Sequence, residues 1–328
     1  MAIKRMKKSS RLACCALATT FAGAASGAVA QNYPSKPVRM IVPFTPGGSQ
    51  DVIARLFAQK LTESFKQQVV IDNRGGAAGL IAAEMVARAP KDGYTLFLIT
   101  GGPISLAPAL HPKLPYDPIK DFAPITQLVD TAMALIVTPA LPVKSVADLI
   151  ALAKTKPLNY GSTGNGSISH LTMEAFKHAT GINVSHVPYK GAAPAMIDML
   201  AGQVSLMFTS TASAAPYVAS GKLRMLAVAW KKRSALMPDV PTLIESGVKD
   251  FESTVWVGMA ATGGTPQPVI RKLHDELVRA LQAPDMQSRL TPLGAEPVGS
   301  TPEQFAALIR EDIARWARVV KASGIGLD

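Results

Sequence analysis

Runs of apolar residues alternate with amphipathic segments along most of this chain. Val38–Val42, Val69–Asp72 and Thr95–Thr100 are continuous apolar runs, which predict strands buried on both faces. Amphipathic helices are predicted between them, over Asp51–Phe65 and Leu80–Ala89. This order predicts a βαβαβ unit with a parallel sheet, an α/β fold. Ligands of such sheets bind at the carboxyl ends of the strands.

A second block of the same kind begins near residue 145. Ser145 and Asp148 have the spacing of a capping box, which predicts the start of a helix that continues to about Lys154. The pattern then predicts, in order, strand Leu158–Tyr160, helix Ser167–Thr180, strand Asn183–Val187, helix Ala192–Ala201, strand Val204–Thr209, helix Ala212–Ser220, strand Leu223–Trp230 and a short helix over Pro238–Gly247.

The chain is expected to cross between these two blocks twice. Strand-like runs at Met133–Thr138 and Thr254–Ala261 are natural crossing strands, and helices are predicted afterwards over Gln267–Ala283 and Pro302–Ala322. We therefore predict one lobe formed by residues 31–131 and 254–328, a second lobe formed by residues 132–253, and a ligand cleft between the lobes. Two domains are also what a chain of this length suggests.

Glycine-rich turns follow three of the predicted strands and precede helices. They contain Gly47-Gly48, Gly75-Gly76 and Gly161 to Gly166. Each turn is expected to leave backbone N–H groups free at a helix N-terminus, where the helix dipole favours an anion, and glycine lets the backbone approach a ligand closely. Any one turn could be ordinary, but three together predict an anion site. The turns lack the lysine of a P-loop and do not match G-x-G-x-x-G, so a nucleotide is not favoured.

The first 30 residues have the pattern of a targeting segment. Five basic residues precede an apolar stretch, and Ala28-Val29-Ala30 predicts cleavage before Gln31, giving a soluble periplasmic protein. A membrane anchor and lipidation at Cys14 are less favoured alternatives, because the apolar stretch is short and Arg11 stands where a lipobox has an aliphatic residue. Both cysteines lie in this segment, so the mature chain would have no thiol.

The charge of the whole chain, +11, overstates that of the mature protein. Without the leader, 29 basic residues stand against 23 acidic ones, a net charge of +6. The densest basic run, Lys231-Lys232-Arg233, is typical of a solvated turn, and nucleic acid is not expected as a partner. A mildly positive protein would attract a small anion.

Few residues of the sequence are candidates for catalysis or metal binding. His170, Glu174 and His178 share a predicted helix face at intervals of four, which could hold a metal but lacks a further ligand, so an ordinary helix face is favoured. There is no G-x-S-x-G turn for a serine nucleophile. Asp51 is interpreted as a structural acid at a helix start. We expect no cofactor, no metal and no enzymatic activity.

The motifs as a set resemble those of the Bug family (Bordetella uptake gene products), the TctC-like substrate-binding proteins of tripartite tricarboxylate transporters. The resemblance covers essentially the whole mature chain. Its motifs are Pro43-Phe44 with Gly47-Gly48 and Asp51, Asn73-Arg74 with Gly75 and Gly79, Pro90 to Leu96, Tyr160 to His170, Val187 to Gly191, Gly202 to Val204, Gly221 to Arg224, and Pro238 to Thr242.

The resemblance implies a two-lobed, type II-like Venus-flytrap fold with two crossing strands. It also implies that a small carboxylate is held between the lobes and passed to membrane permease subunits or reported to a sensor, by a protein we expect to be a monomer. At matching positions it implies that Phe44, Ser49, Ala77, Thr163, Asn165 and Ser167 line the ligand site. We add four further candidate ligand-binding residues: Gly48, His170, Tyr189 and Thr209.

One departure from the family pattern bears on the ligand. Ser205 and Thr209 stand where the family often has acids, which disfavours an amino-acid ligand and favours a purely anionic or aromatic acid. Two other functions stay open at this point: an exported α/β hydrolase or transferase, and the effector lobe of a regulator. The missing nucleophile argues against the first, and the leader against the second.

Overall fold

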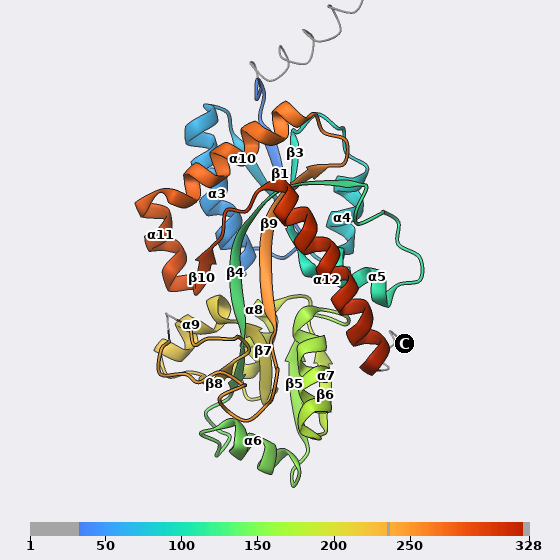
Figure 1. Ribbon diagram of the computed structural model, residues 1–328. Helices are drawn as coiled ribbons and strands as arrows, with labels where there is room; N and C mark the ends of the chain where they lie inside the picture. Colours follow the sequence, from blue (N-terminus) through green and yellow to red (C-terminus); the bar gives the residue numbers. More distant parts are fainter. Residues whose placement is uncertain (1–32, 235–236, 324–328) are drawn as a thin grey trace, which may run out of the picture.

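The computed structural model describes residues 33–234 and 237–323, and the predicted leader with its cleavage site lies outside them. The fold has two α/β lobes, joined by long strands that run from one lobe into the other (Figure 1). Its strands follow the order β2-β1-β3-β9-β4-β7-β5-β6. The predicted two-lobed fold class is therefore confirmed.

The first lobe contains the first predicted parallel unit. β1 (Val38–Val42) pairs in parallel with β2 (Val69–Asn73) and with β3 (Thr95–Thr100), and α3 (Ser49–Phe65) and α4 (Leu80–Ala87) are the crossover helices. β1 and β3 have the predicted bounds. The prediction of burial on both faces is wrong for β2, which lies at the edge of the sheet with Val70 53% exposed.

Two long antiparallel strands connect the lobes. β4 (Phe122–Val137) and β9 (Thr254–Thr262) pair along much of their lengths. The middle of β4, residues 129–131, also pairs with β10 (Ala295–Pro297), and its last residues pair with β7 (Leu206–Ser210) and β8 (Arg224–Val228). The sequence predicted only the final part of β4. The predicted lobe boundaries near 131 and 254 fall within this pair of strands.

The second lobe repeats the parallel arrangement. β5 (Leu158–Ser162) lies between β6 (Val184–Pro188) and β7 (Leu206–Ser210), and β8 (Arg224–Val228) runs antiparallel to β4. Its helices are α6 (Val146–Ala153), α7 (Ile168–Thr180), α8 (Ala192–Leu200) and α9 (Thr211–Ala219). The predicted capping box is present at the start of α6.

The prediction of a helix over Pro238–Gly247 is wrong. The segment forms turns, and it is held against β8 through the backbone bonds of Val228 N–H to the Pro241 carbonyl and Leu243 N–H to the Val228 carbonyl. Pro238 and Pro241 have no N–H group to donate to a helix, so the backbone of β8 supplies hydrogen-bond partners to this segment instead. The sequence also missed η1 (Ala77–Gly79), a π-helical turn η2 (Gly102–Leu106), α5 (Ala107–Leu110), α11 (Pro284–Leu290), η3 (Thr291–Leu293) and β10.

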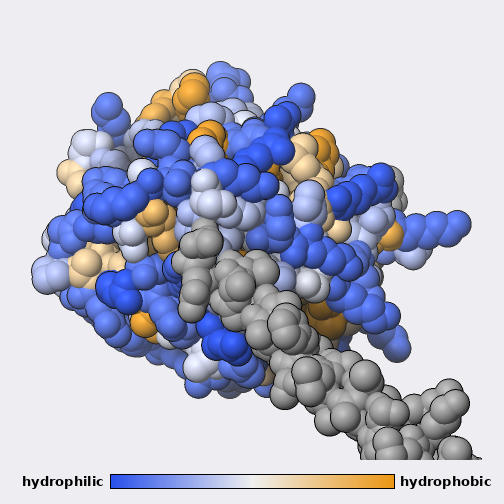
Figure 2. Space-filling view, turned by 90° about the horizontal axis from the view of Figure 1, so that it is seen from above, coloured by the Kyte–Doolittle hydropathy of each residue, from blue (hydrophilic) through white to orange (hydrophobic). Residues whose placement is uncertain are grey.

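The C-terminal helices pack on the first lobe and extend toward the second. α10 (Gln267–Gln282) covers β4 and α3, whereas α12 (Pro302–Ser323) runs down to α7 (Figure 1). The predicted apolar face of α12 buries Phe305, Ile309 and Trp316. The surface over α10 and α3 is mostly hydrophilic, with apolar residues in small separate groups (Figure 2). None of the helices in the described part of the chain is long and apolar enough to cross a membrane.

Candidate functional site

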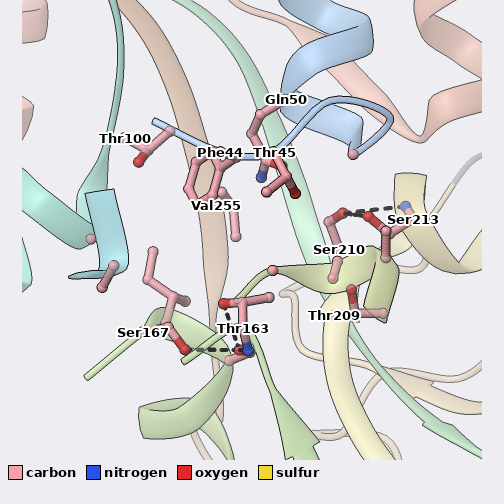
Figure 3. A pocket seen from close by; sticks show the side chains of 18 of the residues that line it. Phe44, Thr45, Gln50, Thr100, Thr163, Ser167, Thr209, Ser210, Ser213 and Val255 are labelled. Atoms are coloured by element: carbon pink, nitrogen blue, oxygen red, sulfur yellow. Dashed lines mark hydrogen bonds between the residues drawn. The ribbon is translucent and has the colours of Figure 1, made fainter. Parts of the chain in front are cut away.

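A cavity lies between the lobes, at the carboxyl ends of the parallel strands. It encloses about 760 Å³, counting the space where it opens to solvent. The first lobe lines it with the β1–α3 loop, η1 and the end of β3, the second lobe with the loops after β5, β6 and β7, and the crossing strands with Met133 and Val255 (Figure 3). Both lobes and the strands that join them therefore surround the same space.

Two helices present uncapped N-termini to this cavity. Gly48 precedes α3 and Gly191 precedes α8, and neither helix start has a side-chain cap. Gln50 of α3 lines the cavity, as do Ala192 and Ala193 of α8. The first backbone N–H groups of a helix have no partner within the helix, and the helix dipole makes this end partially positive. Together these ends favour an anion in the cavity without any basic side chain.

The turn after β5 differs from the expectation of free N–H groups. The N–H of Thr163 donates to Ser169 Oγ at 2.8 Å, that of Gly164 to Ser162 Oγ at 3.1 Å, and that of Gly166 to His170 Nδ1 at 3.1 Å. The expectation is wrong for these amides, because nearby serine and histidine side chains already accept from them. The turn lines the cavity with Thr163 and Ser167 (Figure 3), and the Ser167 hydroxyl donates to the Gly164 carbonyl at 2.7 Å.

The turn after β2 has an unusual backbone. Ala77 and Ala78 both have left-handed conformations, with φ of 46° and 52°. This region costs an alanine roughly 1–2 kcal/mol, and such strain tends to persist where the surrounding structure imposes it at a binding site. Ala78 lines the cavity, so the strained turn is part of the candidate site.

A second, more open compartment adjoins the first. The two share Phe44, Ala78 and Thr163 in their linings. The further lining of the second compartment consists of Pro43, Gly76, Ala77 and Gly79 from the first lobe and Gly164, Asn165, Pro188, Tyr189 and Lys190 from the second.

The ten predicted ligand-binding residues separate into three groups. Those that line the first compartment are Phe44, Gly48, Thr163, Ser167 and Thr209, and those that line only the second are Ala77, Asn165 and Tyr189. Ser49 and His170 line neither compartment. Which of these residues contact the ligand remains a prediction.

Ser49 lies instead at a contact between the lobes. Its hydroxyl is 3.3 Å from that of Ser210 and accepts a hydrogen bond from that of Ser213 at 3.2 Å, and the residue is buried. Both partners belong to the second lobe, at the start of α9. The lobes therefore touch at the margin of the cavity in this conformation.

His170 supports the turn after β5 from behind. Its ring stacks on His186 with centroids 4.1 Å apart, and His186 Nε2 lies 2.6 Å from Ser162 Oγ. Burial lowers the pKa of both imidazoles, that of His186 to about 4. The nearby Glu174 carboxylate accepts hydrogen bonds from the Tyr160 hydroxyl and the Lys177 ammonium. Neutral histidines can accept the hydrogen bonds of the turn, whereas imidazolium ions cannot.

The metal alternative has no support in the described part of the chain. His178 is exposed, whereas His170 and Glu174 have the contacts given above. Within residues 33–234 and 237–323, no group of three or more potential ligands is placed to hold a metal ion.

Asp51 has the structural role that the sequence suggested. Its buried carboxylate accepts from Gly47 N–H at 3.0 Å, Arg55 Nε at 2.9 Å and Asn73 Nδ2 at 2.9 Å. Burial alone would raise the pKa of Asp51, but these hydrogen bonds outweigh it and hold the pKa below its usual range. Asp51 thus fixes the glycine turn of the first lobe and faces away from the cavity, in whose lining it does not take part.

Sequence reasoning missed several cavity residues. Gly191 stands between β6 and α8, Ser210 ends β7 and caps α9, and Ser213 lies in the first turn of α9. A signal was available for them, since β6 and β7 end at the same sheet edge as β5 and each is followed by a helix. Thr100, at the end of β3, was missed too; its buried Oγ1 has no hydrogen-bond partner in the described structure.

Comparison with known proteins decides the family. Residues 53–325 match the model of the tripartite tricarboxylate transporter family receptor, TctC. The chain belongs to this family. It is a receptor-type solute-binding protein, as the resemblance implied. BugT of Bordetella pertussis is 37% identical over 309 residues, which cover 93% of this chain and 95% of BugT.

Solved structures agree with the fold. An R. palustris protein with adipate is 38% identical with a TM-score of 0.87, over 90% of this chain and 99% of that one. MatC from Rhodopseudomonas palustris, with bound malate, is 34% identical with a TM-score of 0.83, over 88% of this chain and 100% of that one.

Proposed function

We propose that this receptor captures a small organic carboxylate between its lobes and delivers it to a membrane permease of the tripartite tricarboxylate type. The observation that carries the proposal is the cavity itself. Two uncapped helix N-termini from opposite lobes line it, and no ionised side chain is found among the described residues of its lining. Partial positive charge from backbone dipoles is suited to holding an anion that must later be released.

Each lobe supplies part of the binding surface. The first lobe offers the N-terminus of α3, and the second offers that of α8 together with the hydroxyls of Thr163 and Thr209. Charge-assisted hydrogen bonds from such donors to a carboxylate are stronger than neutral ones. A carboxylate bound to both sets favours the conformation in which the lobes touch. The adipate and malate found in two relatives support a carboxylate ligand.

The place of action follows from the leader and the family. The basic and apolar segment that ends at Ala30 supports export to the periplasm with cleavage before Gln31. Membership of a transporter receptor family supports integral-membrane permease subunits as the partner that receives the ligand. Intact-mass measurement on a periplasmic extract tests the cleavage, and a lipid-modified Cys14 would contradict it.

Binding is tested directly with matched compounds. Isothermal titration calorimetry of the mature protein would compare a series of carboxylates from four to eight carbons with the neutral diamides and the diamines of equal length. We expect binding among the carboxylates only. Binding of diamines, or of no carboxylate in the series, would contradict the proposal.

We also propose that the bound acid is returned unchanged. The described residues of the cavity include serine and threonine hydroxyls, but the nearest histidine, His170, faces the turn rather than the cavity. Overnight incubation with stoichiometric acid, followed by mass spectrometry of the small-molecule fraction, should recover the input. A new product that disappears in His170→Ala would favour the exported hydrolase or transferase.

A further inference from the structure

Gln50, the second residue of α3, brings a carboxamide into the cavity. Its half-buried side chain points from α3 into the space between the lobes (Figure 3). The amide oxygen, Oε1, accepts the hydroxyl hydrogen of Ser49 at 3.0 Å. The amide nitrogen, Nε2, donates to no described residue, and such a nitrogen carries two N–H groups. Both of these donors are therefore left for a ligand.

A chain of hydroxyl groups fixes the orientation of this amide. Ser210 Oγ donates to Ser213 Oγ at 3.0 Å, and Ser213 Oγ donates to Ser49 Oγ at 3.2 Å. Ser49 then donates to Gln50. A hydroxyl has one hydrogen to give, and each of the three gives it in the same direction, so the chain has to end on an acceptor. An amide turned by 180° would leave the Ser49 hydrogen without one.

This chain of hydroxyl groups crosses from one lobe to the other. Gln50 and Ser49 belong to α3 of the first lobe, whereas Ser210 and Ser213 stand at the end of β7 and the start of α9 in the second. Ser49 and Ser210 are both buried where the lobes meet. The orientation of Gln50 is therefore fixed only while the lobes touch. Hydrogen bonds in a chain polarise one another, so a ligand that accepts from Nε2 strengthens the bond that Oε1 accepts.

We infer that Gln50 donates to the bound acid from Nε2, and that Ser49, Ser210 and Ser213 are positioning residues that orient Gln50 when the lobes close. The inference rests on the proposed function and adds a side-chain donor that is held in place only in the closed conformation. A hydrogen bond to a charged acceptor contributes more than one between neutral groups, so Gln50 is expected to contribute about tenfold in affinity.

The first test is titration calorimetry with adipate, or with the acid of the proposed series that binds the wild-type protein best. Gln50→Leu removes both N–H donors and should lower the affinity by about tenfold. Gln50→Glu keeps an acceptor for Ser49 but turns a negative charge toward the acid, and it should lower the affinity by about a hundredfold. Gln59→Glu makes the same change at an exposed position of α3 and should bind like the wild type. Urea midpoints equal to that of the wild type show that the Gln50 variants are folded.

The second test is a double-mutant cycle, which separates positioning from an independent contact. Ser213→Ala removes the hydroxyl that donates to Ser49 but keeps the backbone N–H that donates to Ser210 Oγ. It should lower the affinity by about threefold to fivefold in the wild-type background and by much less in Gln50→Leu, because the two residues act through one chain of hydrogen bonds. Ser213→Thr keeps a hydroxyl and should bind nearly as well as the wild type.

Two results would overturn the inference. Wild-type affinity in Gln50→Leu would show that the carboxamide does not contact the acid. Equal losses for Ser213→Ala in both backgrounds would show that this hydroxyl acts independently of Gln50. Either result leaves the proposed function standing, whereas failure of every acid in the series to bind the wild-type protein would refute the proposed function and this inference together.

Discussion

His170 and His186 lie face to face, with an angle of 6° between their ring planes, and each contacts the turn that borders the cavity. His170 accepts the Gly166 N–H, and His186 lies within hydrogen-bond distance of Ser162 Oγ. The stack continues to Tyr160, whose ring is 4.8 Å from that of His186 because the two residues are in register on β5 and β6. Protonation of His170 Nδ1 would remove the acceptor of the Gly166 N–H, and a charge on both stacked rings would make them repel each other.

We therefore predict that acid weakens the folded protein in a particular pH window. The pKa of His186 is about 4 in the folded state, below its unfolded value of 6.5, and that of His170 is lowered too. Between these values the unfolded chain binds protons that the folded chain does not. The contribution of these histidines to the free energy of unfolding is therefore fully present above pH 6.5. It is lost as the pH drops from 6.5 toward 4.

The measurement is urea unfolding at pH 7.5, 6 and 5, where the carboxylates remain mostly ionised. His186→Gln should flatten the dependence on pH, whereas His178→Gln, on the exposed side of α7, should not. The groups that face the stack are Glu174, which raises the imidazole pKa values, and Lys177, which lowers them. A slope that is the same in wild type and His186→Gln would show that the stack does not control the acid response.

The parts of the fold that the sequence predicted are those set by local pattern. β1 and β3 are mostly apolar, and Ser167 caps α7 through the His170 N–H, so the bounds of these elements follow from the local sequence. The first half of β4 could not be found this way. It contains Pro124, Thr126 and Gln127, and it is a strand because β9 pairs along it, with bulges between Pro124 and Thr126 and between Gln127 and Val129.

The site was predictable only in part for a related reason. Glycine turns are visible in a sequence, but their hydrogen-bond partners are not. The amides of Gly164 and Gly166 are occupied by Ser162 and His170, which only the folded turn reveals. His186 was missed because nothing in its own segment indicates that β6 places it beside His170. Ser49 was predicted to bind the ligand, and its contacts with Ser210 and Ser213 of the other lobe could not be read from its own segment.

A charge at the lobe contact should weaken ligand binding. Ser49→Asp would place a carboxylate between the Ser210 and Ser213 hydroxyls, where burial on closure leaves it without a cation. We expect carboxylate affinity to fall by roughly 2–5 kcal/mol, the cost of an unpaired charge at an interface. Val52→Asp places the same charge on the same helix at an exposed position and is the control. Titration calorimetry measures the affinity of each variant. Unchanged affinity in Ser49→Asp would show that this lobe contact does not contribute to ligand binding.

Removing the charge of Asp51 should destabilise the first lobe. Asp51→Asn keeps the size of the side chain but loses the ion pair with Arg55. It also replaces one of the two carboxylate oxygens, both of which accept hydrogen bonds, with an amide NH2 group. We expect the free energy of unfolding to fall by about 1–3 kcal/mol at pH 7, because a buried donor is left poorly satisfied. Glu63→Gln, at an exposed position of α3, should change it by less than about 0.5 kcal/mol. Equal urea midpoints for the two variants would contradict the role given to Asp51.

The lobes should separate in the absence of ligand. The contacts of Ser49 with Ser210 and Ser213 are single hydroxyl hydrogen bonds, each worth about 1 kcal/mol or less in net terms, so they hold the lobes together only weakly. A carboxylate that reaches the N-termini of α3 and α8 together binds the closed conformation better than the open one, and it shifts the population accordingly.

Small-angle scattering of the mature protein should show a smaller radius of gyration at saturating carboxylate than without it. Ser49→Asp should keep the larger radius even at ligand concentrations that saturate it, because the introduced charge opposes the lobe contact. Tight binding at an unchanged radius in the wild type would mean that the lobes are closed before the ligand arrives, and it would remove closure from the binding cycle.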